Sequence, residues 1–283
     1  MQQHLKEILN PGRLAEIVDI GANPVDGDPP YKVMMDAGLA SVTGFEPHPG
    51  ALQALLEKKT AAERYLPYAV GDGGEHQLHI CAASGMTSLL EPDTSTLQLF
   101  EELLPLAHVL ERMPLKTKRL DDIDEIEKID FLKMDIQGGE LSVLANGRSK
   151  LSQAVAIQIE ISFITLYKGQ PGFGEIDTEL RKQGFIPHCF AAVKHWPIAP
   201  CVVDNQPRKA LNQLLEADLV YVKDFSKPDG FSDEQLKQLA LIAHHCYRSF
   251  DLTLRCIYLL ELRGSLPAGS QARYLESFKA PTA

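Results

Sequence analysis

A run near the middle of the chain, KIDFLKMDIQGGE at residues 128–140, places polar groups where an apolar strand pattern ends. The pattern from Ile129 to Ile136 is typical of a strand covered on both faces, and the glycine pair that follows predicts a turn. Because side chains alternate along a strand, Lys133 and Asp135 project to the same side. A carboxylate in this setting can remove a proton from a nucleophile or orient it. We interpret Asp135 as a candidate base and Lys133 as the group that keeps it ionised or polarises the nucleophile.

Glu160 is a second acid in an unexpected setting, because it lies within the apolar run AVAIQIEISF at residues 154–163. A carboxylate at the end of a buried strand is costly without a partner, and perturbed acids of this kind favour functional sites. We therefore predict a catalytic role for Glu160, with a structural hydrogen-bond acceptor as the alternative. Glu140, in the helix pattern that follows the glycine pair, is equally well explained as a cap on the positive end of that helix.

Three more acids follow three successive strand patterns: Asp19 in VDIGAN, Glu46 in GFEPHP and Asp72 in AVGD. Ligands of open α/β sheets bind beyond the carboxyl ends of the strands, where small residues such as Gly21 let a ligand approach the backbone. Glu46 is placed to accept hydrogen bonds from a ribose diol, and Asp72 from an adenine amino group. Each acid is also compatible with a plain turn, but the set of three favours nucleoside recognition. A nicotinamide-dependent oxidoreductase is disfavoured because the chain lacks GxGxxG.

The elements that must position these residues alternate between strand and helix patterns, which predicts a doubly wound, parallel α/β sheet of seven or more strands. Strand patterns lie at residues 16–21, 41–47, 64–70, 76–82, 115–120, 129–136, 154–163, 185–190 and 218–225. Helix patterns lie at residues 30–38, 48–59, 139–146 and 176–184. A long helical insert is expected over residues 94–112, because Phe100 and several leucines supply one apolar side.

Residues 226–235 are rich in Pro, Gly and Ser and predict a linker between a main domain, 1–225, and a helical appendage, 226–283. Apolar residues at helical spacing after the linker predict a small C-terminal helical hairpin that resembles one tetratricopeptide-like unit. One such unit cannot bury its own apolar face, so it must dock on the main domain or on a second copy of the chain. A homodimer through these helices is therefore a candidate assembly.

The composition predicts a folded globular protein, with 45% hydrophobic residues and a net charge of -10 in 283 residues. The acidic charge argues against binding to nucleic acid or to an anionic membrane surface. We find no apolar window long enough for a membrane span or a signal peptide, so a cytoplasmic protein without membrane contact is expected. Five widely spaced cysteines without a CxxC pair predict neither disulfides nor a zinc site, and the scattered histidines make no metal pair.

Seven short motifs together resemble, in order and in approximate spacing, the FkbM-type S-adenosylmethionine-dependent methyltransferases over roughly residues 17–190. They are VDIGAN, GFEPHPGALQAL, AVGDGGEHQLHI, TSLL, RLDDI, DFLKMDIQGGELSVLANG and IQIEISF. The resemblance implies a class I methyltransferase, with a Rossmann-like, seven-stranded sheet and S-adenosylmethionine as cofactor. It also implies methyl transfer to a hydroxyl oxygen of a sugar, glycan or natural product. A noncatalytic S-adenosylmethionine-binding or interaction module with the same fold is the alternative.

Roles for individual residues follow from the same resemblance. Asp19, Gly21, Ala22 and Asn23 would line the methionine and ribose side of the cofactor. Glu46, with Pro47 completing the FEP motif, would take the ribose hydroxyls, Asp72 would face adenine, and Thr87 or Ser88 would lie on a neighbouring loop. Two positions depart from the family pattern, which usually has Gly at the position of Val25, where Gly27 is a substitute, and an acid at the position of Gln137.

Overall fold

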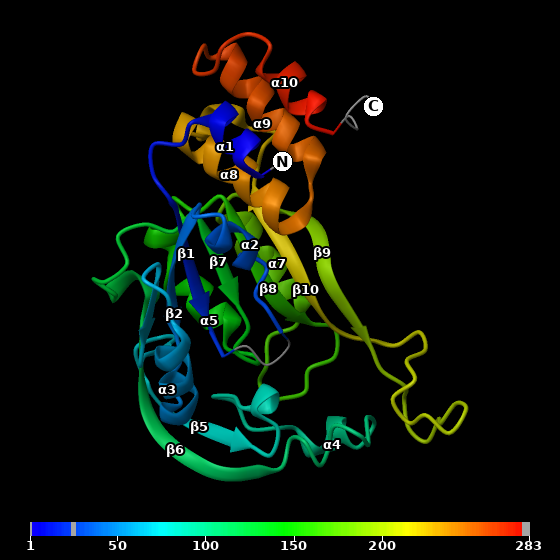
Figure 1. Ribbon diagram of the computed structural model, residues 1–283. Helices are drawn as coiled ribbons and strands as arrows, with labels where there is room; N and C mark the ends of the chain where they lie inside the picture. The colour runs from blue at the N-terminus through cyan, green and yellow to red at the C-terminus, as the bar shows by residue number, and fades with distance from the viewer. Residues whose placement is uncertain (1, 24–26, 279–283) are drawn as a thin grey trace.

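A doubly wound sheet of seven strands organises the computed structural model, which describes residues 2–23 and 27–278 (Figure 1). The strand order is β3-β2-β1-β7-β8-β10-β9, so the chain winds outward from β1 and then returns to its other side at β7. All neighbouring pairs are parallel except those made by β10, which is antiparallel to β8 and β9. The strands are β1 (Ala15–Ile20), β2 (Ala40–Phe45), β3 (Glu63–Leu66), β7 (Phe131–Met134), β8 (Ala156–Ser162), β9 (Phe185–His195) and β10 (Leu214–Lys223). The expected seven-stranded sheet is confirmed, although it is mixed rather than wholly parallel.

Helices cover both faces of this sheet because its central strands are apolar on both sides. Ile17 and Phe131 belong to one core, whereas their neighbours Val18 and Leu132 belong to another. All seven residues of β8 are buried, as expected of a strand between two helical layers. The helices of this part are α2 (Lys32–Asp36), α3 (Pro49–Lys58), α5 (Glu140–Ala145), α6 (Arg148–Leu151) and α7 (Phe173–Lys182). Among residues 2–23 and 27–278, no helix is long and apolar enough to cross a membrane.

A second, three-stranded sheet has the order β4-β6-β5 and lies beyond the ends of β1 and β2 (Figure 1). Its strands are β4 (Ala69–Val70), β5 (Glu75–Cys81) and β6 (Val109–Lys118). The strand expected at 64–70 is therefore divided between two sheets, since only 63–66 pair with β2. Pro67, between the two pieces, cannot donate a ladder hydrogen bond, which explains the division.

The long helix expected over residues 94–112 is wrong. Only α4 (Thr94–Leu97) is helical there, turns follow, and β6 begins at Val109. Leu97 and Phe100 are buried in a small separate core with Leu166 and Leu215, so the apolar spacing reports burial and not a continuous helix. Pro105 disfavours helix continuation because it lacks the amide hydrogen and crowds the preceding turn.

Four helices gather at the amino ends of the central strands, opposite the small sheet (Figure 1). They are α1 (Gln2–Leu9), α8 (Asp233–Tyr247), α9 (Phe250–Leu262) and α10 (Ser270–Glu276). The expected hairpin is present as α8 and α9, whereas α1 and α10 were not predicted. Leu239 and Ile257 share one core with Ile17 and Phe131 of the sheet. The helices thus pack on the sheet, and the division into domains 1–225 and 226–283 stays a prediction.

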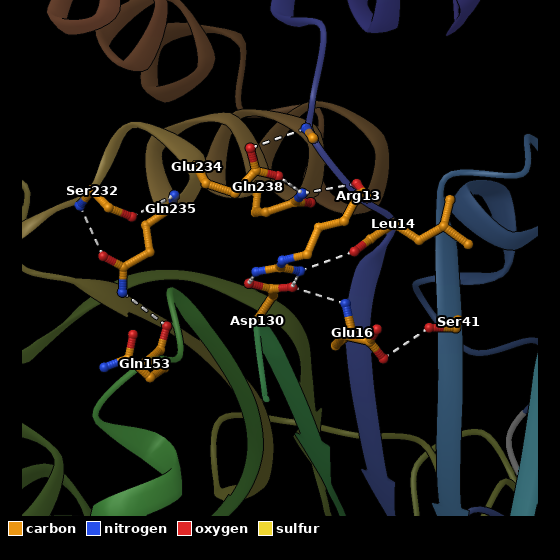
Figure 2. Close-up of polar contacts among 11 residues, drawn as sticks. Arg13, Leu14, Glu16, Ser41, Asp130, Gln153, Ser232, Glu234, Gln235 and Gln238 are labelled. Carbon is orange, nitrogen blue, oxygen red and sulfur yellow. Dashed lines mark hydrogen bonds and ion pairs between the residues drawn. The ribbon is translucent and has the colours of Figure 1, made fainter. Parts of the chain in front are cut away.

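Polar contacts also join α8 to the sheet (Figure 2). Arg13, just before β1, donates two hydrogen bonds of 2.5 and 2.8 Å to the carboxylate of Asp130, which precedes β7. Gln238 on α8 donates to the carbonyl oxygen of Arg13 at 3.2 Å, and Gln235 donates to that of Gln153 at 3.0 Å. Arg13 therefore connects the amino ends of two central strands with the C-terminal helices.

Removal of this ion pair should destabilise the protein. Asp130 is 1% exposed, so Arg13→Met leaves a buried carboxylate without its cation. We expect the free energy of unfolding to fall by about 2 to 3 kcal/mol, measured by chemical denaturation. Lys32→Met is the matched control, because the Lys32–Asp36 pair is solvent-exposed and contributes little. Equal effects of the two substitutions would contradict this account.

Candidate active site

A cavity of 1540 Å³ lies at the carboxyl ends of β1, β2 and β7, where the strand order reverses. Ligands bind at this switch point in open α/β sheets. The small sheet and the 3₁₀ turn Ser84–Met86 contribute the facing wall. Sites for a single small ligand are about 300–1,000 Å³, so this cavity has room for two ligands side by side.

Gly21 makes the turn after β1 close tightly on the end of β7. Its φ is +82°, and a Cβ at this position would lie 2.0 Å from the carbonyl oxygen of Asp135. The backbone amides of Gly21 and Ala22 both donate to the carbonyl oxygen of Phe45 at 3.1 Å. Only glycine fits this approach, so the turn leaves backbone, and no side chain, at the cavity wall.

Asp19 and Lys133 are register partners on β1 and β7 and form a buried ion pair at the cavity. Lys133 Nζ lies 3.4 Å from Asp19 Oδ1, and Tyr31 donates to Asp19 Oδ2 at 2.6 Å. Burial raises the pKa of Asp19, and Lys133 opposes that effect. Burial lowers the pKa of Lys133, but Asp19 and then Asp135 outweigh it and raise that pKa overall. The direct partner of Lys133 is thus Asp19, which corrects the expectation that it pairs with Asp135.

Asp19 Oδ1 is buried, and its ion-pair partner Lys133 Nζ is 3.4 Å away, while no described residue makes a short hydrogen bond to it. A buried acceptor without a short hydrogen bond is unfavourable unless a ligand supplies the donor. Because Asp19 lines the cavity, a cationic or hydroxyl donor of a bound ligand can satisfy it.

The end of β2 supplies Glu46 and Pro47 to the same cavity, which Ala22, Asn23 and Gly27 also line. Glu46 Oε1 accepts from the backbone amide of His48 at 2.8 Å, and no described residue donates to Oε2. Burial raises the pKa of Glu46. The structure thus brings these predicted residues together. Val25, where the family pattern has Gly, lies outside the described residues.

Asp72 is not brought to the cavity, so the expected adenine contact is not supported. Its Oδ1 accepts from His76 Nε2 at 2.8 Å, Gly74 N at 2.8 Å and Thr117 Oγ1 at 3.0 Å. The bond from His76, followed by that from Gly74, lowers the pKa of Asp72 to about 2. Tyr68 and Val70 of the preceding segment line the cavity instead. The sequence shows an acid after a strand, but not that its carboxylate closes a local turn.

Asp135 lines the cavity, whereas Glu160 does not. Gln137 stands between them: its Nε2 donates to Asp135 Oδ1 at 2.9 Å and to Glu160 Oε2 at 2.7 Å. Burial and the nearby charge of Asp135 raise the pKa of Glu160. Glu160 therefore supports the site from behind Gln137, which favours the alternative structural role.

The loop position of Ser88 is as expected, and its hydroxyl is engaged by protein. Ser88 lines the cavity, donates to the carbonyl oxygen of Gln137 at 2.6 Å and accepts from Leu90 N at 2.9 Å. Thr87 beside it accepts from Cys81 N at 3.2 Å. Ser88 therefore holds the loop against the strand ends, and its hydroxyl already donates to protein.

A polar wall from β8, β9 and β10 was missed by the sequence analysis. It contains Gln158, Lys194, Glu216 and Asp218, beside Trp196. Lys194 Nζ lies 2.8 Å from Glu216 Oε1. Glu216 and Asp218, two charged residues at alternate positions in an apolar strand, were the available signal, and Lys133 and Asp135 were identified from the same alternation of charged residues. Within the described part of the chain, no group of three or more His, Cys, Asp or Glu side chains is arranged to hold a metal ion.

The seven-stranded, doubly wound sheet with its cavity at the switch point is a Rossmann-like fold. Residues 19–187 match the family described as the methyltransferase FkbM domain, and the chain belongs to this family. The chain is 30% identical over 162 residues to the 2-O-methyltransferase NoeI of Sinorhizobium fredii. That match covers 54% of this chain and 66% of the relative.

Two solved structures are also similar. Magnesium protoporphyrin IX methyltransferase (ChlM) from Synechocystis PCC 6803 is 12% identical, with a TM-score of 0.37 over 78% of this chain and 79% of that one. Precorrin-6y C5,15-methyltransferase from Geobacter metallireducens is 10% identical, with a TM-score of 0.36 over 78% of this chain and 87% of that one.

Glu140 should make stability depend on pH. It is buried, its Oε1 accepts from Ile136 N at 3.0 Å, and burial raises its pKa to about 7. The unfolded chain releases this proton near pH ~4.3, so folding takes up a proton between the two values and stability falls as pH rises. Glu140→Gln cannot titrate. We therefore compare its free energy of unfolding with that of the unmodified protein by urea denaturation. The difference, variant minus unmodified protein, should rise by up to about 3 kcal/mol between pH ~4.5 and pH ~7. A difference that does not change with pH would refute the assignment.

Proposed function

We propose that the protein transfers a methyl group from S-adenosylmethionine to a hydroxyl oxygen of a sugar, glycan or natural product. The observation that carries the proposal is the Asp135 carboxylate at the end of β7, facing a cavity large enough for a cofactor and an acceptor. Membership of the FkbM methyltransferase family supports the reaction class, and the name of the relative NoeI, a 2-O-methyltransferase, supports oxygen as the acceptor atom.

The residues on the β1 and β2 side fit S-adenosylmethionine. Asp19 Oδ1, which has only the 3.4 Å ion pair with Lys133, would accept from its ammonium group, and the Gly21 turn leaves space where a side chain would collide with backbone. Glu46 Oε2 would accept from the ribose hydroxyls, which are good donors to a carboxylate. Tyr65 lines the same side and offers an aromatic face to the adenine.

Bound S-adenosylmethionine supplies a methyl group on a sulfonium, so the leaving group needs no further activation. The protein has two tasks, which are to hold the acceptor hydroxyl in line and to take its proton. Asp135 Oδ1 is held by Gln137, and no described residue donates to Oδ2. Oδ2 is therefore the atom that would accept the proton as the oxygen forms its new bond to carbon.

The wall formed by Lys194, Glu216, Asp218 and Trp196 would hold the acceptor. Carboxylates accept hydrogen bonds from hydroxyl groups, and the indole ring offers an apolar face for a ring of the acceptor. Burial raises the pKa of Asp218, as expected for a carboxyl group withdrawn from bulk water. This chemistry fits a neutral, polyhydroxylated acceptor better than an anionic one, because acids outnumber bases at the wall.

The finer expectations on partners and location stay predictions. We propose that the protein works in the cytoplasm, does not bind nucleic acid and forms homodimers through its C-terminal helices. Leu262 of α9 is 66% exposed and Leu275 of α10 is 49% exposed, which supports these helices as a contact surface. Sedimentation of the unmodified protein and of Leu262→Glu would test the dimer, which is ruled out if both are monomers.

Replacement of Asp135 should separate binding from turnover. We expect Asp135→Asn to lower kcat by about 10²- to 10⁴-fold, because the general base is lost. Calorimetric affinity for S-adenosylhomocysteine should stay within about twofold of the unmodified protein, since the amide keeps the size of the carboxylate. Turnover would be followed by transfer of label from S-adenosylmethionine to an extract of cells that lack the protein.

Asp72→Asn is the matched control, because Asp72 lies outside the cavity. Asp72→Asn should change neither turnover nor affinity. If Asp72 did contact the adenine, its replacement would weaken binding. A folded protein that binds neither S-adenosylmethionine nor S-adenosylhomocysteine would overturn the proposed function. Binding without turnover in any extract would favour the noncatalytic alternative.

A further inference from the structure

Gln137 occupies a strained position at the centre of the site. Its φ is +57°, in the left-handed region that non-glycine residues rarely adopt. Ser88 holds the residue there by donating to its carbonyl oxygen at 2.6 Å. Gly138, the next residue, continues the turn with a φ of +106°. Backbone strain of this kind costs about 1–3 kcal/mol and persists where surrounding contacts determine the conformation. The conformation delivers the Gln137 side chain between β7 and β8.

The Gln137 amide satisfies three partners at once. Both Nε2 hydrogens are used, one on Asp135 Oδ1 at 2.9 Å and one on Glu160 Oε2 at 2.7 Å. Tyr167, which is 2% exposed, donates to Oε1 at 2.9 Å. An ionised acid at this position would have no hydrogen to donate, so it could not join the two carboxylates. The departure from the family pattern therefore fits its surroundings.

We propose that Gln137 is a positioning residue that ties Asp135 Oδ1 to Glu160 and so presents Oδ2 to the acceptor hydroxyl, an inference that rests on the proposed function. The Tyr167 hydroxyl lies 2.9 Å from Oε1 and 3.1 Å from the carbonyl oxygen of Met86, so its single hydrogen is placed between these two acceptors, on the opposite side of the amide from the acids. Glu160 anchors the amide from behind without reaching the cavity. The two acids thus differ in role, one facing the acceptor and one supporting.

The charge around Asp135 explains why an amide is suited to this position. Acids and bases from every adjoining element face it or its partner Glu160: Asp19, Lys133, Glu140, Tyr167, Lys194, Glu216 and Asp218. Carboxylates outnumber the two lysines in this set. One more carboxylate at residue 137 would add like-charge repulsion to this set and would supply no hydrogen-bond donor. Gln137 supplies two donors and no charge.

Two substitutions of Gln137 distinguish the effect of its hydrogen bonds from the effect of its neutrality. Gln137→Glu keeps the shape and adds a carboxylate, so the acidic limb of the kcat/KM profile should move up by about one pH unit. Gln137→Met keeps most of the volume without donors, so kcat should fall by about 10- to 100-fold at every pH. Affinity for S-adenosylhomocysteine should stay within about twofold in both variants. The assays contain EDTA, because the carboxylate introduced by Gln137→Glu, together with Asp135 and Glu160, can bind a divalent cation.

A merely structural residue would give a different result. It would lower the melting temperature while kcat of the folded fraction and the acidic limb stayed in place, and that outcome would overturn the inference. Tyr167→Phe is a second variant, which removes the donor to Oε1 but keeps the ring. We expect it to lower kcat about fivefold or more at unchanged affinity for S-adenosylhomocysteine, and an unchanged kcat would count against the inference.

A readout without turnover distinguishes this inference from the proposed function. Carbon-13 NMR can follow the Asp135 carboxyl carbon, assigned by its loss in Asp135→Asn. Its chemical shift should change in Gln137→Met relative to the unmodified protein, with or without an acceptor, because the hydrogen bond to Oδ1 is lost. If the unmodified protein binds no cofactor or transfers no label, the proposed function fails. If it turns over but the chemical shift in Gln137→Met and the acidic limb in Gln137→Glu are unmoved, the positioning role fails.

Discussion

The buried ion pair between Asp19 and Lys133 fixes the point from which the site is built. The two residues are register partners on β1 and β7, the adjacent strands at which the sheet reverses its order. A buried charge without a partner is strongly unfavourable, so each residue requires the other, and a shift in register would separate them. The same pairing sets the Gly21 turn against the Asp135 carbonyl, because both follow directly in the chain. The cofactor side and the acceptor side of the cavity are thereby held in one arrangement.

The central part of the fold could be predicted from the sequence because local pattern and tertiary role agree there. Ile17, Val18, Phe131 and Leu132 are apolar on both faces, and the helices on either side require that pattern. Asp19, Glu46 and Asp135 were selected because an acid at the end of an apolar strand is costly unless it has a partner, and all three line the cavity. Their placement around the cavity follows from topology alone, since parallel strands end at the same edge.

Other predictions failed where one local pattern had two explanations. Leu97 and Phe100 have helical spacing, but they fill a small core between turns, and spacing alone does not distinguish these cases. Asp72 follows a strand as Glu46 does, but a nearby His and Thr engage its carboxylate. Gln137 was recognised as a departure, whereas its partners Glu160 and Tyr167 lie 23 and 30 residues away in the chain. Such contacts are set by tertiary structure and leave no periodic signal.

The two ends of the sheet have different physical tasks. At the amino ends, Arg13 and Asp130 join the strands to helices that share a continuous apolar core with them, which gives rigidity. At the carboxyl ends, the insertion between β4 and β7 covers the cavity with turns and with Met86 and Leu106. The β5–β6 ladder frames this insertion, but residues 82–108 between the two strands form mostly turns, so the shape of that segment depends on side-chain packing. Changes in a few of its apolar residues can alter the acceptor wall while the ion pair between Asp19 and Lys133 stays intact. If the proposed function holds, acceptor choice can therefore vary on this fold without disturbing Asp135.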